Sequence, residues 1–320
     1  MTRRNGTIGV LLPRDTPARD VIAFARRADA RGFDELWVVE DLGYRGGLAQ
    51  AATVLAATTR IRVGIGLLPA GARNVAFTAM EIASLAQFHP GRLDVAIGHG
   101  VPAWMRGVGA WPQSPLTLLS EYISVLKSLL SGRLVQHEGR YVRIDGLRLD
   151  DSSLPAAAPM VLAGVRAPRS LGVSGEVADG TLLAEPVTPA YVRQALTHIA
   201  PTRPHRLVAY NVAAVDDDPA AALAAVRPAL DVVGEPDWRP HIAPLPFHDD
   251  LLALRSRCDG PREFAGALPD EWVRQLAVAG TPGEARSRLE DLFDAGVTSA
   301  VLTPVGPDHL ASLDALAAVL

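Results

Sequence analysis

Short apolar runs alternate with helical patterns along most of the chain, and this alternation constrains the fold more than any other feature. Apolar runs at 8–13, 33–39, 61–68 and 93–97 each precede a segment with helical periodicity, the first of which ends at Gly32. Each such unit predicts a buried strand joined to an amphipathic helix. Repetition of the unit is typical of a parallel sheet covered by helices.

The alternation is interrupted after a helix predicted at 116–130. The segment 135–145 alternates polar and apolar residues around a central glycine and predicts a β-hairpin, which we place in an insertion at 134–149. Residues 234–270 are rich in proline and in charges of both signs, and we expect an irregular insertion of extra helices or a lid there. Four further strands are predicted at 160–164, 181–184, 207–215 and 297–302.

Eight predicted strands in 320 residues fit an α/β fold, a single (β/α)8 TIM barrel whose one domain spans 1–320, with insertions after the fourth helix and the seventh strand. The last crossover helix, at 282–295, has Thr281 as its N-cap and Gly296 as its C-cap. An open doubly wound sheet is the alternative. That fold more often carries Gly-x-Gly-x-x-Gly after its first strand, and Gly9-Val-Leu-Leu-Pro does not match.

The composition narrows the class of protein. Apolar residues make up 48% of the chain, enough for a large core, and a net charge of −4 does not favour a nucleic acid or a membrane surface as partner. The single cysteine, Cys258, excludes an internal disulfide and a metal site of several cysteines. No apolar run approaches the roughly 20 residues of a membrane span. With no signal-peptide pattern at Met1–Arg4, we expect a cytoplasmic protein.

Several predicted strands end in glycine or in a titratable side chain. Gly98-His99-Gly100 ends the fourth strand, Glu40-Asp41 follows the second, and Glu185 follows the sixth. In a barrel these carboxyl ends meet at one face, where function concentrates. Histidine and carboxylates are the usual acid–base groups. Taken alone, Gly98-His99-Gly100 is equally compatible with a tight turn and a solvated histidine.

The same side chains have two other interpretations. Carboxylates and histidine also bind divalent ions, but here each comes singly from a different strand, without a His-x-His or His-Glu-x-x-His element, and we expect no metal. For each carboxylate, a helix cap or an ion pair with arginine is the structural alternative. The strand ends therefore predict a site, and they leave its chemistry open.

A series of short motifs spans nearly the whole chain. The first four are Gly32-Phe-Asp-Glu-Leu-Trp-Val-Val-Glu-Asp, Thr59-Arg-Ile-Arg-Val-Gly-Ile-Gly, Ala83-Ser-Leu-Ala and His89-Pro-Gly-Arg-Leu. The Gly98-x-Gly100 strand end follows, and then Ala178-Asp-Gly-Thr, Gly280-Thr-Pro-Gly-Glu, Ala295-Gly-Val-Thr and Pro304-Val-Gly-Pro-Asp. In this order and at these spacings the chain resembles the luciferase-like flavin and deazaflavin oxidoreductases. Within them it looks most like the branch of the coenzyme F420-dependent methylenetetrahydromethanopterin reductases.

The resemblance implies a cofactor ring in the mouth of the barrel. A bulge at the end of the third strand, often with a non-prolyl cis peptide, backs the ring; here that maps to Gly66-Leu67, with Gly64-Ile65 as second choice and an ordinary trans strand end as alternative. Gly98 and Gly100 are expected at the polar edge of the ring. The backbone of Ala163, Gly164 and Val165, with Arg166 nearby, is expected to bind the cofactor phosphate.

One departure from the family pattern concerns proton transfer. The deazaflavin branch often has Asp-His after its second strand, whereas this chain has Glu40-Asp41, so that Asp41 stands in the place of the histidine. The resemblance then implies that His99, Asp41 or Glu185 moves the proton, with His99 first among them. Glu40 is expected to hydrogen-bond the ring or to cap the second helix.

The implied function is transfer of a hydride between C5 of F420 and a small organic substrate. Trp104 and Met105 are expected to wall the substrate pocket, with simple packing of the loop as alternative. An FMN-dependent luciferase-like monooxygenase is the nearest alternative, a non-catalytic flavin-binding barrel is the alternative of another class, and a metal-dependent hydrolase comes third. The resemblance also implies a homodimer.

Overall fold

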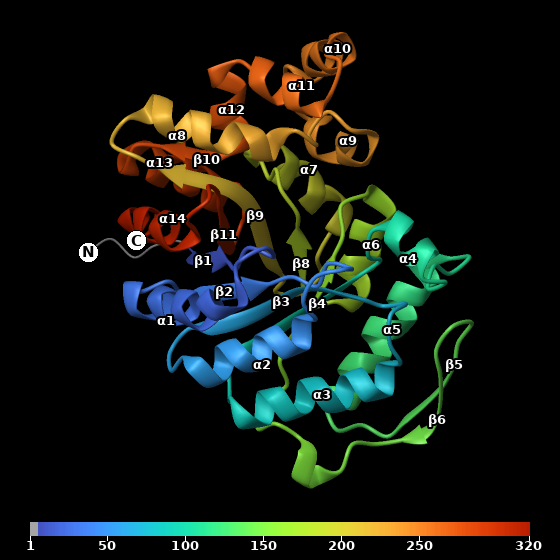
Figure 1. The fold of residues 1–320 in the computed structure, drawn as a ribbon. Coiled ribbons are helices and arrows are strands. Elements are labelled where there is room, and N and C mark those ends of the chain that lie inside the picture. Colours follow the sequence, from blue (N-terminus) through green and yellow to red (C-terminus); the bar gives the residue numbers. More distant parts are fainter. Residues whose placement is uncertain (1–5) are drawn as a thin grey trace.

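Eight parallel strands close into a barrel in a computed structural model that describes residues 6–320. Figure 1 shows the strands at the centre of the molecule with helices around them. The last strand pairs with the first, so the sheet has no open edge, and the predicted TIM barrel is confirmed over the doubly wound alternative. Around the barrel the order is β1 (Thr7–Leu11), β2 (Glu35–Val38), β3 (Arg62–Pro69), β4 (Leu93–Gly98), β7 (Met160–Gly164), β8 (Gly180–Leu183), β9 (Arg206–Val215) and β11 (Ser299–Pro304).

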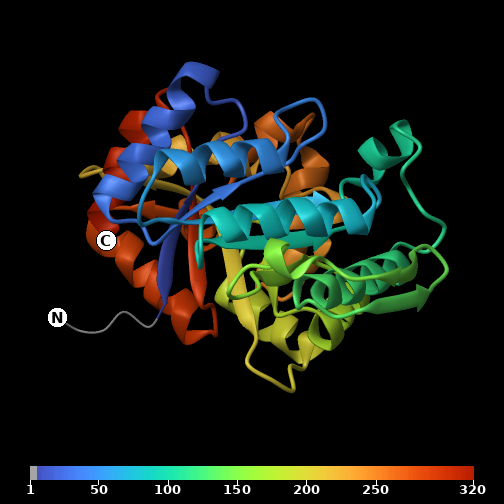
Figure 2. The same cartoon turned by 90° about the horizontal axis from the view of Figure 1, so that it is seen from below.

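Helices connect consecutive strands and cover the outside of the barrel (Figures 1 and 2). Gly32 ends the first of them in a left-handed conformation, with φ of 97°. Thr281 caps α13 in a reciprocal capping box with Glu284, so the predicted N-cap is confirmed. The covering helices are α1 (Val21–Arg31), α2 (Gly47–Ala57), α3 (Val75–Phe88), α5 (Pro115–Leu130), α6 (Pro168–Val177), α7 (Pro189–Ile199), α13 (Pro282–Asp294) and α14 (His309–Leu316), with η1 (Ala18–Asp20) before α1 and η5 (Ala317–Val319) after α14.

The interior of the barrel has an apolar middle and a charged floor. Inward side chains such as Trp37, Leu162 and Val208 pack together in the middle. At the amino ends of the strands, Arg206 donates to the buried carboxylates of Glu35 and Asp94. This charged floor lies at the end of the barrel opposite to the carboxyl ends of the strands, so it closes the barrel away from the expected site.

The predicted hairpin stands outside the barrel. It consists of β5 (Val135–Glu138) and β6 (Arg143–Leu147), which form a separate two-stranded antiparallel sheet beside α5. The linker after it carries one short turn, η2 (Asp151–Ser153). The structure adds α4 (Pro102–Gly107), where the sequence suggested a loop, because Pro102 begins a helix too short to show a period.

The long segment after β9 forms a helical layer with its own core. It begins with α8 (Pro219–Val226), which gives way to η3 (Arg227–Leu230) because Pro228 has no N–H to continue the helical ladder. The layer continues with η4 (Pro236–Trp238), α9 (Arg239–Ile242), α10 (His248–Arg257), α11 (Pro261–Ala267) and α12 (Asp270–Leu276), gathered at the top of Figure 1. A further short strand, β10 (Val278–Gly280), pairs with β9 outside the ring of eight.

Among the described residues, no helix is both long enough and apolar enough to cross a membrane. The prediction about a signal peptide falls on Met1–Arg4, which lie outside the described residues.

Candidate active site

The predicted site residues come from the carboxyl ends of β2, β3, β4, β7 and β8, which are neighbours in the sheet. The end of β3 is irregular, as predicted: its register with β4 shifts between Gly66 and Leu68, and the Gly66-Leu67 peptide bond is cis. Leu67 lies across the ends of β4 and β7, since a Cβ atom on Gly98 or Gly164 would stand 2.5 Å from its Cδ2 atom. Glycine at both positions is therefore what admits Leu67.

Glu40 is held by two neighbours. Its carboxylate accepts a hydrogen bond from the Gly47 N–H at 2.8 Å, which caps α2, and two from the Arg73 guanidinium at 2.8 and 3.0 Å. Of the two roles expected for Glu40, the structure shows the helix cap. Arg73 was not among the predicted site residues, because the loop between β3 and α3 carries no motif that singles it out.

Asp41 is paired with Arg14, which follows β1. The Arg14 guanidinium donates to the Asp41 carboxylate at 2.7 Å and lies 4.8 Å from the ring centre of Tyr44. Both charged side chains are partly exposed at the rim of the mouth. The pair places a cation, Arg14, just after β1. In the sequence this strand ends in Leu12 and Pro13, which have no charge.

His99 is a neutral histidine at neutral pH. Its Nε2 atom shares a hydrogen bond with Ser170 Oγ, on α6, at 3.0 Å. Burial lowers the pKa of His99 below its ordinary value, because the charged ring would lose its hydration. The imidazole can therefore donate or accept at the mouth, and the solvated-turn alternative for this stretch does not hold.

Glu185, which follows β8, is half-buried, as are Glu40 and Asp41. Burial raises the pKa of Glu185 and the charge of Asp41 raises it further, while Arg166 and Arg14 act in the opposite direction. The net effect favours the protonated carboxyl. A carboxyl group that keeps its proton near neutral pH can act as a general acid.

Tyr210, on β9, brings a hydroxyl group to the same region. Its ring packs edge-on against Trp37, and its hydroxyl is buried without a hydrogen-bond partner among the described residues. Burial raises the pKa of Tyr210, so the hydroxyl stays protonated. A Cβ atom on Gly66 would stand 2.2 Å from this hydroxyl, so only glycine allows the close approach.

The helical layer after β9 covers the end of β8. The Trp238 indole donates to the Glu185 carbonyl at 3.1 Å, and the Arg166 guanidinium lies 4.8 Å from the Trp238 ring centre. His241 contacts the Pro186 carbonyl at 3.2 Å. The sequence did not predict these residues, because 234–270 has no period to place them; the tryptophan isolated among prolines and charges was the available signal.

The predicted phosphate site needs one correction. The Val165 N–H donates to the Leu182 carbonyl at 3.2 Å, so it continues the barrel ladder and is not a free donor. Ala163 and Gly164 lie within β7, and Arg166 reaches the mouth, where it also donates to the Asp237 carbonyl at 3.3 Å. The sequence suggested the Val165 N–H as a phosphate donor because Gly164 precedes it. In the structure this N–H is used in sheet pairing and is not available to a phosphate.

Trp104 and Met105 lie on α4 rather than on a loop. Met105 is buried against two glycines: a Cβ atom on Gly100 would stand 2.9 Å from its sulfur, and one on Gly71 would stand 3.3 Å from its Cε atom. Trp104 is half-buried. Met105 therefore stands between the end of β4 and the segment that follows β3.

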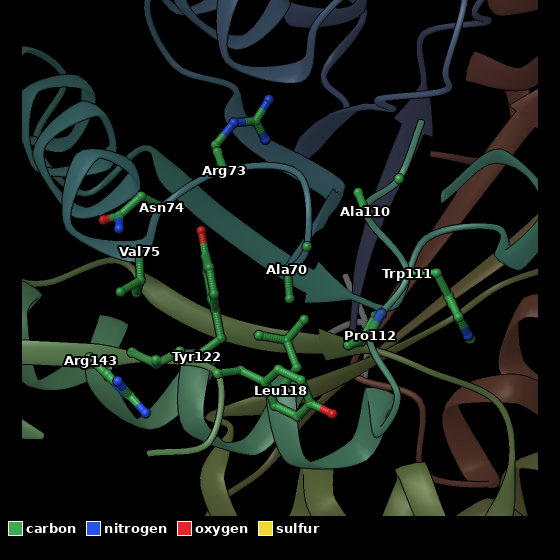
Figure 3. Close-up of a pocket in the computed structure, with 14 residues that line it drawn as sticks. Ala70, Arg73, Asn74, Val75, Ala110, Trp111, Pro112, Leu118, Tyr122 and Arg143 are labelled. Carbon is green, nitrogen blue, oxygen red and sulfur yellow. The ribbon is translucent and has the colours of Figure 1, made fainter. Parts of the chain in front are cut away.

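A cavity of about 330 Å³ lies beside the β3–α3 loop (Figure 3). The β3–α3 loop, the segment before α5, α5 itself and β6 surround it, with Arg73, Trp111, Tyr122 and Arg143 among the lining residues. None of the predicted site residues lines it. Among residues 6–320, no three His, Cys, Asp or Glu side chains are grouped so as to hold a metal ion.

Comparison with known proteins places this geometry in a family. The family model described as luciferase-like monooxygenase matches residues 5–299. The 5,10-methylenetetrahydromethanopterin reductase of Methanolobus tindarius is 28% identical over 94% of this chain and 95% of its own. The F420-dependent glucose-6-phosphate dehydrogenase of Intrasporangium calvum is 28% identical over 94% and 93%. The coenzyme F420-dependent tetrahydromethanopterin reductase of Methanopyrus kandleri superposes with a TM-score of 0.82 at 20% identity, over 98% of this chain and 97% of its own.

Proposed function

The chain belongs to the luciferase-like monooxygenase family, and from this membership we propose that it is an F420-dependent oxidoreductase acting on a small organic substrate. It is an enzyme of the flavin- or deazaflavin-dependent oxidoreductase class. An F420-dependent dehydrogenase among relatives that match over nine-tenths of the chain supports the deazaflavin as its cofactor. When bound, the deazaflavin supplies the carbon, C5, that takes up or releases the hydride.

The donor groups at the mouth suit a flat ring with a polar edge. Gly98 and Gly100 offer backbone without side chains at the end of β4. The hydroxyls of Tyr210 and Thr303 are buried at this end of the barrel without a hydrogen-bond partner among the described residues. Buried polar groups usually have a partner, and those without one at a strand end are suited to a ligand or water. The donor set therefore fits a deazaflavin or a flavin.

We assign separate parts of the mouth to the two ends of the cofactor. Gly66, Leu67, Gly98 and Gly100 are assigned to the ring, and Arg166, with Ala163 and Gly164 beside it, is assigned to the phosphate. A guanidinium matches a phosphate in geometry as well as in charge. Glu40, which caps α2 and pairs with Arg73, holds the wall of the site in place.

Among the three acid–base candidates, Glu185 is best suited to hold the proton that accompanies the hydride. It is the carboxyl group whose pKa burial raises. His99 is neutral and bonded to Ser170, and Asp41 is paired with Arg14, so both are suited to orient the substrate or Glu185. This assignment moves the proton donor from His99, which the sequence placed first.

The observation that carries the proposal is that glycine strand ends and acid–base side chains meet at one edge of the barrel. The test is to titrate the purified protein with F420 and with FMN and to follow the fluorescence of each. We expect F420 to bind more tightly. Gly98→Ala should weaken this binding because the added carbon meets Leu67, whereas Gly283→Ala, at an open position on α13, should not. Binding of FMN alone would contradict the proposal.

A monooxygenase that uses reduced FMN is the second candidate. The description of the matching family model favours it, because it names a monooxygenase. Oxygen uptake with reduced FMN and the absence of F420 binding would support this candidate. A protein that binds neither cofactor would instead fit the non-catalytic barrel.

We also propose that the protein is a homodimer. The outer face of α3 exposes Phe77, Met80 and Phe88, with 66%, 52% and 70% of each residue accessible. Apolar side chains aligned on one exposed helix face commonly mark a protein interface. Sedimentation should give a dimer that Phe77→Ser weakens; a monomer at micromolar concentration would contradict this.

A further inference from the structure

The cavity of Figure 3 has the walls of a prepared binding site. The Glu121 carboxylate accepts the N–H groups of Arg140, Tyr141 and Val142 at 2.8–2.9 Å and so holds the hairpin against α5. The Tyr141 hydroxyl accepts the Ser114 N–H at 2.7 Å, which fixes the segment before α5. Its volume, about 330 Å³, is at the lower end of ligand cavities, which span about 300–1,000 Å³.

The lining of this cavity is aromatic. Trp111, Tyr122 and Tyr141 come from three different segments and line the cavity. The Tyr122 hydroxyl donates to Thr78 at 2.7 Å, so this ring is held by its polar end. Rigid rings of this kind bind flat ligands by stacking and by dispersion contacts.

The charged residues of the cavity lining are both arginines, Arg73 and Arg143, although the chain carries a net charge of −4. None of the lining side chains is acidic among the described residues. Arg106 lies 5.1 Å from the ring centre of Trp111, and Arg140 lies 5.3 Å from that of Tyr141. Local charge opposite to the net charge of the protein favours an anionic ligand.

The two arginines of the lining differ in how far their charge is compensated. Arg73 is paired with Glu40, whereas Arg143 makes no ion pair with any residue of the described chain. Glu138 is the cross-strand partner of Arg143 in the hairpin but lies beyond ion-pair distance. Arg143 is therefore the cation available to one carboxylate in the cavity.

We propose that this cavity is a second binding site, for an organic anion that combines a flat ring with one carboxylate. It is separate from the cofactor site, because no residue assigned to the cofactor or to proton transfer lines it. Met105 is the partition, since its side chain touches both Gly71, in the cavity wall, and Gly100, at the mouth. In this proposal, the Met105 side chain separates the bound anion from the cofactor site.

Calorimetric titration of the full chain with naphthalene-2-carboxylate tests the proposal without any cofactor. We expect saturable binding that Arg143→Gln weakens roughly five- to tenfold, the loss of one charge-assisted contact at a solvated site. Arg133→Gln, an exposed arginine outside the cavity, should bind like the wild type. Trp111→Leu should weaken binding further, and neutral naphthalene-2-methanol should bind equally weakly to the wild type and to Arg143→Gln.

Three results would overturn the proposal. They are the absence of binding to the wild type, equal affinities for Arg143→Gln and Arg133→Gln, and displacement of the probe by F420 or FMN. The last result would show that the cavity belongs to the cofactor site. Failure of the protein to bind F420 would contradict the proposed function and leave this titration unaffected.

Discussion

At the scale of single residues, burial shifts the pKa values of the titratable groups at the mouth in opposite directions. It raises the pKa of Glu185 and lowers that of His99, so burial favours the neutral form of each side chain. The sequence predicts both residues at strand ends. It does not predict their protonation, which depends on covering groups such as Trp238 from a segment without periodicity.

Glu185→Gln should remove the proton donor for substrate reduction. We expect kcat to fall by about 10²–10⁴-fold with any substrate the protein reduces, the usual contribution of general acid catalysis. In the wild type, reduction should slow as pH rises through the pKa of Glu185, and the variant should lack this dependence. Glu176→Gln, on the exposed face of α6, is the control. Wild-type kcat in Glu185→Gln would rule out this role.

The raised pKa of Glu185 also predicts how stability depends on pH. Because the folded protein holds this proton more tightly than the unfolded chain, the group costs stability as pH rises above the ordinary glutamate value of about 4.3. Arg166 and Arg14 reduce the effect and Asp41 increases it. The melting temperature of Glu185→Gln, relative to the wild type, should therefore be higher at pH 8 than at pH 4. A constant difference would contradict the buried, protonated state.

At the scale of elements, periodicity locates long helices and strands, and single contacts determine the rest. The helix that follows Thr281 begins where its predicted N-cap places it. The short α4 and β10 carry too few residues for a period. The hairpin follows from its alternation, but its attachment to α5 depends on Glu121, which no local pattern identifies.

Glu121→Ala should release the hairpin. Burial tends to raise the pKa of Glu121, and the backbone N–H groups of Tyr141, Val142 and Arg140 outweigh it, so the net pKa is lowered. Its stabilisation is present above the ordinary glutamate pKa and is lost as pH falls through the lowered value. At neutral pH, amide hydrogen exchange at 140–142 should be faster in Glu121→Ala and unchanged in Glu138→Ala. Equal exchange in both variants would show that other contacts hold the hairpin.

At the scale of the whole molecule, the barrel could be predicted because each strand–helix unit repeats the same pattern. The closing strand pairs and the irregular end of β3 agree with the predictions. The helical layer over 234–270 could not be placed, because its residues form a core of their own, around Leu251 and Phe264, rather than one side of an amphipathic stripe. No sequence pattern predicts the charged floor, because Glu35, Asp94 and Arg206 come together only when the barrel closes.

Arg206→Met should show what this floor contributes. It would leave the Glu35 carboxylate, whose side chain is 2% exposed, without a cation, whereas Asp94, 3% exposed, keeps its ion pair with Arg62. Removal of one partner from a buried ion pair costs about 3–5 kcal/mol in the free energy of unfolding, measured by chemical denaturation. Arg31→Met, which breaks a surface pair with Asp314, should cost at most about 1 kcal/mol. Similar costs for the two variants would contradict this account.

The central claim is that the carboxyl ends of β2, β3, β4, β7 and β8 form the cofactor site. A crystal structure of the protein grown with F420 tests it most directly. We predict the ring against Gly66-Leu67 and Gly98, with Glu185 in contact with the reacting region and the phosphate at Arg166. A ring in the cavity beside Trp111, or outside the barrel mouth, would contradict the claim.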